Sequence, residues 1–208
     1  MKNLKRILSA AVACATLLST LSVSAWAAAS GVFSDEDQIV NRQAVTITSS
    51  QGLFTGYDDG TFGPDRVVTR AEAAVVIAKL LYGAQVDPSQ HVMENKFDDV
   101  PDWANGYVCL AAADRIVEGY GNRTFGPNDP VTTVQFATML LKSLGYYTNE
   151  LDELDTQWKE TVTHKANQLG LYGHLELEMD EGLRREDMAQ MVFQTLFLRN
   201  VENIGELN

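Results

Sequence analysis

The chain has 208 residues, of which 28 are acidic and 16 are basic, giving a formal net charge of −12. Binding to a phosphate backbone requires a basic face, so this composition argues against nucleic acid as a partner. The length is sufficient for one compact core.

The first 29 residues have the pattern of a secretory signal peptide. Three basic residues precede an apolar run over 7–23, and small residues flank Trp26 at a cleavage site. An uncleaved membrane anchor is the alternative, but the serines and threonines within the apolar run argue against it. We therefore expect cleavage after Ala27 or Ala29, export, and no transmembrane span in the mature chain. Without the three basic residues the formal charge becomes 13 − 28 = −15.

Cys109 is the only cysteine after the signal segment, so the mature chain cannot form an internal disulfide. A single cysteine can be a catalytic nucleophile. However, Cys109 lies within the apolar run Tyr107–Ala113, which favours a buried, unreactive thiol. Cys14 suggests a lipoprotein, but the apolar run continues past it and argues against cleavage there.

A glycine-rich motif occurs twice along the chain. Gly56-Tyr-Asp-Asp-Gly-Thr-Phe-Gly-Pro64 returns 63 positions later as Gly119-Tyr-Gly-Asn-Arg-Thr-Phe-Gly-Pro127. Aspartate and glycine in this arrangement are typical of turns. Thr69 and Thr132, also 63 positions apart, each precede an apolar helical pattern as N-cap residues. Agreement at one constant offset indicates an internal repeat.

A third, eroded copy follows. Trp158 stands as far before Gly170 as Trp103 stands before Arg115, but the Asp-Gly-Thr-Phe-Gly-Pro element is missing. We align residues 183–186 with the Thr-Arg-Ala-Glu sequence of the first repeat, so that Arg184 corresponds to Arg70.

These alignments predict the domain organisation. We expect repeats over 31–83, 97–145 and 151–198, a linker over 84–96, and a loose C-terminal tail over 199–208. Each repeat is expected to form a helix, a loop and a second helix, with first helices over 103–116 and 158–169. The β-branched stretch over 44–48 is compatible with a strand, but the repeat favours a helix there. The fold class is therefore mainly α, with three helix-loop-helix repeats packed as a pseudo-threefold bundle.

Arg70 is an unusual residue for its position. It lies in the first turn of a predicted helix, where the helix dipole favours anions rather than cations. A guanidinium group beside free backbone N–H groups can bind a carboxylate. Pairing with Asp58 or Asp65 to hold the loop is the alternative.

Aromatic side chains could supply an apolar platform for a sugar ring. The candidates are Tyr57, Trp103 and Trp158. Packing in the core is the alternative for the two tryptophans. Asp58-Asp59-Gly60 lacks the ligand spacing of a calcium loop, and the three histidines share no spacing, so we expect no metal site and no cofactor.

These motifs resemble tandem S-layer homology domains. In the first copy the resemblance rests on Phe33, Asp35, the loop over 56–64 and Thr69-Arg-Ala-Glu72; in the second it rests on Phe97, Asp99-Val100, Trp103 and the loop over 119–127. The resemblance implies three domains with grooves between them, which bind secondary cell-wall polysaccharide, often through a pyruvate ketal, or peptidoglycan. It assigns the main ligand contact to the arginine of Thr-Arg-Ala-Glu, assisted by the early aspartate and the tryptophan.

The predicted glycan-binding residues are therefore Arg70, Asp35, Tyr57, Asp99, Trp103, Trp158 and Arg184. The second repeat has Thr133 at the arginine position and is expected to lack its main anion contact. At most two grooves are expected to be competent.

The predicted function is non-covalent anchoring at the cell envelope by a secreted cell-surface protein that is not an enzyme. Its partners would be wall polysaccharide or peptidoglycan, with another envelope protein as a further candidate. The alternative is an exported protein–protein scaffold that has lost glycan binding. A wall hydrolase is disfavoured because no residues remain to build a catalytic domain.

Overall fold

The computed structural model describes residues 33–92, 96–146 and 156–205. The predicted signal peptide over 1–29 lies outside the described residues. Within the described part, helices are joined by loops that contain only isolated β-bridges, so the predicted mainly α fold is confirmed. The elements are η2 (Glu36–Gln38), α2 (Arg42–Ser50), α3 (Arg70–Tyr82), η3 (Pro88–His91), α4 (Asp102–Ala113), α5 (Thr133–Ser143), α6 (Trp158–Gln168) and α7 (Arg185–Gly205).

Two of the helices start at a capping box. The Thr69 backbone N–H donates to the Glu72 carboxylate at 2.9 Å, and the Glu72 N–H donates to the Thr69 hydroxyl oxygen at 3.3 Å. Thr132 and Gln135 repeat this exchange at the start of α5. Each box satisfies backbone donors that would otherwise lack partners at a helix start.

The β-branched segment over 44–48 lies inside helix α2, as the repeat predicted. Its position is explained by burial, because Ala44, Val45 and Thr48 form the inward face of the helix. The Thr48 hydroxyl donates to the Ala44 carbonyl oxygen at 2.7 Å, which satisfies the one polar group on that face.

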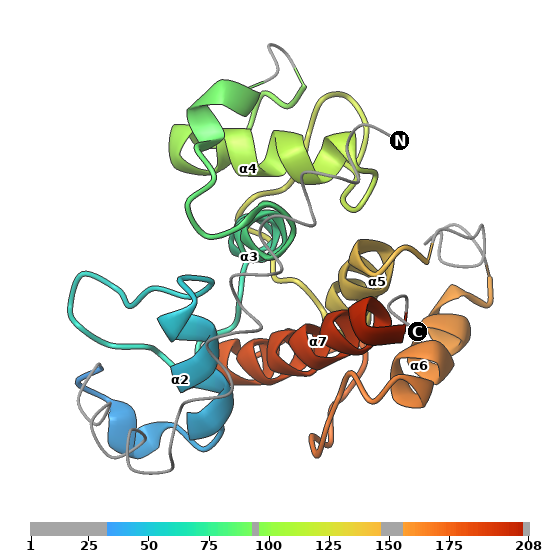
Figure 1. Ribbon diagram of the computed structural model, residues 1–208. Coiled ribbons are helices and arrows are strands. Elements are labelled where there is room, and N and C mark those ends of the chain that lie inside the picture. The colour runs from blue at the N-terminus through green and yellow to red at the C-terminus, as the bar shows by residue number, and fades with distance from the viewer. Residues whose placement is uncertain (1–32, 93–95, 147–155, 206–208) are drawn as a thin grey trace.

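The helices pair in a cyclic order that crosses the repeat boundaries. Helix α4 packs on α3, α6 packs on α5, and α2 packs on α7 (Figure 1). The first helix of the second and third repeats therefore packs on the second helix of the repeat before it. The first helix of the first repeat packs on the second helix of the third repeat, which completes the cycle. Helix α5 also contacts both α3 and α7. The bundle is thus closed by contact between the two ends of the described chain.

Three buried residues form the centre of this closed arrangement. Val68, Val131 and Leu183 each stand just before the start of a second helix, and each is almost completely buried. Their backbones form a ring of hydrogen bonds: Val68 N–H to Leu183 O at 3.0 Å, Val131 N–H to Val68 O at 3.0 Å, and Leu183 N–H to Val131 O at 2.9 Å. This ring gives the bundle a local pseudo-threefold axis.

Two segments outside the helix pairs differ from expectation. The predicted linker over 84–96 contains η3, which packs on α4. The stretch predicted as a loose tail from residue 199 instead continues helix α7 as far as Gly205. The sequence between Arg185 and Ile204 contains neither glycine nor proline, so nothing in it breaks the helix.

None of the helices within residues 33–92, 96–146 and 156–205 has the length and apolar character required to cross a membrane.

Candidate functional site

The candidate site is a set of three junctions, each formed where a second helix begins against the loop of the next repeat. Backbone N–H groups at the helix start donate to carbonyl oxygens of that loop. We name each junction after the first helical residue. The bonds are Arg70 to Asp129 and Ala71 to Pro127 at the Arg70 junction, Thr133 to Glu181 and Val134 to Met179 at the Thr133 junction, and Arg185 to Arg66 and Glu186 to Pro64 at the Arg185 junction.

The third repeat aligns one residue later than expected. Arg185, not Arg184, is the first residue of α7 and occupies the place that Arg70 holds in α3. Arg184 takes the N-cap place of Thr69. The ring of Val68, Val131 and Leu183 fixes this alignment because Leu183 is the buried residue before the cap. Matching that apolar position, rather than the Arg-x-Glu pattern, would have identified Arg185 from the sequence.

Arg70 spans the Arg70 junction. Its Nε donates to the Phe125 carbonyl oxygen at 3.1 Å and its Nη2 donates to the Glu118 carbonyl oxygen at 2.8 Å. The guanidinium carbon lies 4.7 Å from the ring centroids of both Tyr120 and Phe125. The suggested pairing of Arg70 with Asp58 or Asp65 is not present; Arg70 fixes the loop of the second repeat instead.

Arg185 makes equivalent contacts at the Arg185 junction. Its Nη2 donates to the Thr55 carbonyl oxygen at 2.6 Å, and its guanidinium carbon lies 4.7 Å from the Tyr57 ring centroid and 5.0 Å from that of Phe62. Thr55, Tyr57 and Phe62 stand 63 positions before the three residues that Arg70 contacts. Burial is the main cause that lowers the pKa of Arg185, although an arginine stays protonated in proteins.

The Thr133 junction has no cation at the equivalent position. Thr133 is buried there, and its backbone N–H donates to the Glu181 carbonyl oxygen at 3.1 Å. The loop that it faces lacks the glycine-rich motif. The three junctions are thus equivalent in backbone geometry but differ in chemistry.

Asp35 and Asp99 hold the glycine-rich loops. The Asp35 carboxylate accepts hydrogen bonds from the backbone N–H groups of Phe62 and Gly63, each at 2.8 Å. Asp99 accepts from Phe125 and Gly126 at the same distances. Both carboxylates are therefore bound to the loop backbone, which places the two junction phenylalanines.

The three aromatic candidates lie in different environments. Tyr57 is half-buried at the Arg185 junction, and its hydroxyl donates to Glu72 at 3.2 Å. Burial is the main cause that raises the pKa of Tyr57. Trp103 is 57% exposed on α4. Trp158 is buried, and its indole Nε1 donates to the Thr138 hydroxyl at 3.2 Å, so Trp158 is a packing residue.

Arg184 forms ion pairs instead of stacking on the loop aromatics. Its Nε donates to Asp187 at 2.8 Å and its Nη1 donates to Asp65 at 3.0 Å. These contacts raise the pKa of Arg184, chiefly through the hydrogen bond to Asp187. Arg184 links α7 to the first loop, and its predicted role in glycan binding stays a prediction.

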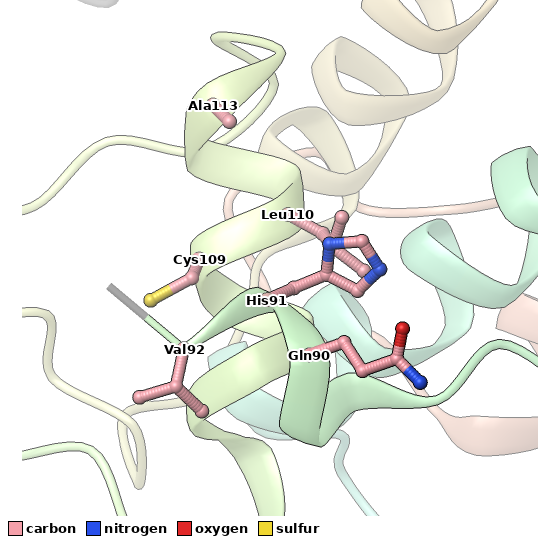
Figure 2. Close-up of a pocket in the computed structure, with 6 residues that line it drawn as sticks. All are labelled: Gln90, His91, Val92, Cys109, Leu110 and Ala113. Atoms are coloured by element: carbon pink, nitrogen blue, oxygen red, sulfur yellow. The ribbon is translucent and has the colours of Figure 1, made fainter. Parts of the chain in front are cut away.

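A separate pocket of about 250 Å³ lies between η3 and α4. It is lined by Gln90, His91, Val92, Cys109, Leu110 and Ala113 (Figure 2). Cys109 is buried, as predicted, and its sulfur points away from the His91 ring. Over the described ranges, no group of three histidine, cysteine or acidic side chains is arranged to hold a metal ion.

A family model for the S-layer homology domain matches residues 32–74 and 96–137. These two ranges contain the glycine-rich loops, the aspartates that hold them, and the starts of α3 and α5. A third domain over 151–198 stays a prediction, supported by the equivalent backbone geometry at the start of α7.

Several bacterial surface proteins are similar to the chain. "Middle cell wall protein" of Brevibacillus brevis is 28% identical over 158 residues, which cover 69% of this chain and 14% of that protein. "Cell surface protein" of Thermoanaerobacter kivui is 29% identical over 199 residues, covering 94% of this chain and 25% of that protein. "Cellulosome-anchoring protein" of Acetivibrio thermocellus is 33% identical over 137 residues, covering 65% and 31%.

The chain spans less than a third of the length of each of these relatives. Both the matched domain and the relatives indicate a location at the bacterial cell surface. The repeat found in the sequence, the cyclic helix pairing and the family match agree. The chain therefore carries S-layer homology domains in tandem, at residues 32–74 and 96–137.

Proposed function

We propose that this protein anchors non-covalently to the bacterial cell wall by binding an acidic wall polysaccharide at the Arg70 and Arg185 junctions. The ligand would present an anionic group, such as the carboxylate of a pyruvate ketal, to a guanidinium group. The protein would act as a binding module without catalysis, and peptidoglycan is the second polymer to be tested.

The observation that carries this proposal is the state of the two arginines. In a chain with 28 acidic residues, neither Arg70 nor Arg185 has a carboxylate within ion-pair distance in the described part of the chain. Both are instead held by loop carbonyl oxygens and aromatic rings. A partly bonded guanidinium group at a helix N-terminus is suited to an external anion.

Arg70 also keeps a donor available for a ligand. Its Nη1 group makes no hydrogen bond with the described residues and is not fully buried. A charged hydrogen bond contributes about 1.5–3 kcal/mol, which is too little for durable attachment. Two junctions acting on one polymer would raise the overall affinity without any new contact. The chain repels anionic polymers by its net charge, so binding would depend on these local cations.

Co-sedimentation with purified wall sacculi tests the proposal. The parent protein is compared with Arg70→Gln, Arg185→Gln and the double variant, using sacculi before and after removal of the secondary polymer. Arg42→Gln is the matched control, because Arg42 is an exposed arginine that pairs with Glu36 away from the junctions. Thermal melting shows whether each variant is folded.

The parent and Arg42→Gln should sediment with intact sacculi, each single variant less so, and the double variant should stay in solution. Sedimentation only with stripped sacculi would identify peptidoglycan as the ligand. Equal sedimentation of a folded double variant and the parent would show that the arginines only support the fold, and would refute the mechanism.

A protein–protein scaffold is the alternative function. The observation in its favour is that both arginines already hold loop carbonyl oxygens, so they have a structural role without any ligand. Against this alternative, the Thr133 junction makes the same backbone contacts without a cation. If the parent protein fails to sediment with any sacculi, this alternative replaces the anchoring proposal.

A further inference from the structure

The Arg185 junction contains a second guanidinium group. The guanidinium carbon of Arg66 lies 3.8 Å from the Tyr57 ring centroid, and that of Arg185 lies 4.7 Å from the same centroid. Arg66 is exposed on the first loop, whereas Arg185 is buried at the start of α7. Neither forms an ion pair within the described ranges. Two cations therefore share one aromatic ring.

The buried arginine has an unsatisfied donor. The side chain of Arg185 is only 7% exposed, and its Nε has no hydrogen-bond partner in the part of the chain that the structure describes. Leaving a buried donor of a charged group unpaired costs about 1–3 kcal/mol or more. The guanidinium group of Arg66 lies over the Tyr57 ring. Its N–H groups point outward in the plane of the guanidinium group, so they can donate to a ligand beside the ring.

Charged side chains of both signs lie around the two arginines. Lys79 on α3 is close enough that Arg185 contributes, after burial, to lowering the pKa of Lys79. Two nearby acids are already engaged: the Glu72 carboxylate accepts hydrogen bonds from the Thr69 N–H and the Tyr57 hydroxyl, and the Asp59 carboxylate accepts from the Thr61 N–H and hydroxyl. The anion-binding capacity of the two arginines is therefore not used by a carboxylate of the protein.

The Arg70 junction has an acidic residue at the position of Arg66. Asp129 stands 63 positions after Arg66. A methyl group added to Gly63 would meet the Arg66 side chain and the Tyr57 ring, and one added to Gly126 would meet the Asp129 carboxylate and the Tyr120 ring. Arg66 and Asp129 thus lie beside the equivalent tyrosines of the two loops.

This exchange of charge makes the two arginine junctions chemically different. Counted over these two pairs of positions alone, the change from Asp129 to Arg66 adds two positive charges and the change from neutral Gln135 to Glu72 removes one, a local difference of 2 − 1 = 1 beside the tyrosine. At the Arg70 junction, the carboxylate of Asp129 would repel a second negative charge on a ligand.

We propose that Arg66 determines ligand charge at the Arg185 junction, where Arg66 and Arg185 together bind a doubly charged phosphate group, while the Arg70 junction accepts a singly charged carboxylate. This inference rests on the proposed function in assuming that the phosphate is a monoester on the wall polymer, since a diester would carry only one negative charge. A guanidinium pair matches a phosphate because two forks can donate to different oxygens of one group. Free phosphate shares this chemistry, and the experiment separates the two sources.

The first measurement is an NMR titration of the arginine Nε–Hε resonances with inorganic phosphate and with acetate, at constant ionic strength and neutral pH. In the parent protein the Arg185 resonance should respond to phosphate at about a tenfold lower concentration than to acetate, corresponding to one added charged hydrogen bond. The Arg70 resonance should show no such preference.

Reciprocal variants provide the matched test. Arg66→Asp should abolish the phosphate preference at Arg185, and Asp129→Arg should create one at Arg70. Both positions are exposed, so the fold should tolerate either change. Arg42→Gln controls for the loss of a surface charge. An unchanged preference in Arg66→Asp, equal responses of both arginines in the parent, or no response to phosphate would each overturn the inference.

The second measurement distinguishes a phosphate ester of the wall polymer from free phosphate. It also distinguishes a failure of this inference from a failure of the proposed function. Sacculi stripped of phosphate esters by hydrofluoric acid should retain less parent protein than untreated sacculi, whereas retention of Arg66→Asp should change little. Equal retention of the parent would show that the junction takes free phosphate and would refute the polymer ester. Failure of the parent to sediment with any sacculi, with the phosphate preference intact, would overturn only the proposed function.

Discussion

The guanidinium group of Arg185 donates a 2.6 Å hydrogen bond to the backbone carbonyl oxygen of Thr55, which joins the start of the last helix to the loop of the first repeat. Arg70 makes the corresponding bond to Glu118 at 2.8 Å. The first of these contacts closes the ring of repeats, because it links residues at opposite ends of the described chain. The fold should therefore depend on Arg185 even without a ligand.

Replacing Arg185 with alanine should lower the free energy of unfolding by about 2 kcal/mol, because the Thr55 carbonyl oxygen loses a charged donor at a part-buried site. Urea denaturation followed by circular dichroism measures the change. The control is Arg42→Ala, which removes an exposed ion pair with Glu36 and should change stability by less than about 1 kcal/mol. Equal effects of the two substitutions would show that Arg185 does not support the closure of the ring.

The two loop-holding aspartates should differ in their contribution to stability. Asp35→Asn replaces one carboxylate oxygen by an amide N–H₂ group that cannot accept from the loop backbone, and Asp35 is only 7% exposed. We expect a loss of about 1–3 kcal/mol. Asp99→Asn breaks the same contact at an exposed aspartate, where water can replace the lost partner, so the loss should be smaller.

Denaturation of the two variants side by side provides the measurement, since each serves as the control for the other. A loss for Asp99→Asn as large as that for Asp35→Asn would contradict the role assigned to burial.

Gly106 should not tolerate a side chain. A Cβ atom at this position of α4 would overlap the carbonyl oxygen of Pro88 in η3. Gly106→Ala should therefore separate η3 from α4 and lower the free energy of unfolding by about 1–3 kcal/mol. Hydrogen exchange at the Ser89–His91 amides reports on this contact.

The substitution Asp102→Ala, at an exposed position of the same helix, is the control and should change stability by about 0.5 kcal/mol or less. Unchanged exchange at the η3 amides in Gly106→Ala would show that the close approach of Pro88 is not required.

Tyr172 should make the protein sensitive to alkaline pH. Burial raises the pKa of Tyr172 to about 12 from the ordinary value of 10.0. The unfolded chain thus loses the phenolic proton at lower pH than the folded chain does. The stability that depends on this proton is complete below pH 10 and is lost as the pH rises towards about 12.

Tyr172→Phe should remove this part of the alkaline loss. At neutral pH the variant should be about as stable as the parent, because the buried hydroxyl has only a weak contact with Thr163 and no well-formed hydrogen bond in the described ranges. Urea midpoints measured from pH 7 to 12 test both statements, with Tyr107→Phe as the control for losing a tyrosine elsewhere. Parallel pH profiles of parent and Tyr172→Phe would contradict the burial argument.

Local signals in the sequence were sufficient for the helices. The sequence correctly predicts the capping residues Thr69 and Thr132, because a cap acts over three or four residues. The repeat also predicted the helix over 44–48 against its β-branched composition. The sequence analysis expects a loose tail over 199–208, whereas α7 continues as far as Gly205.

The sequence by itself determined the repeat, the helical class and the presence of an arginine at one helix start, since each depends only on residue identity and spacing along the chain. Only the tertiary structure decided which helices pair, that Arg185 rather than Arg184 is the equivalent of Arg70, and that Arg66 and Arg185 meet at Tyr57. These relationships depend on contacts between the two ends of the chain. The hydrogen-bonded ring of Val68, Val131 and Leu183 fixes them, because a shift by one residue would break the ring and expose a buried side chain.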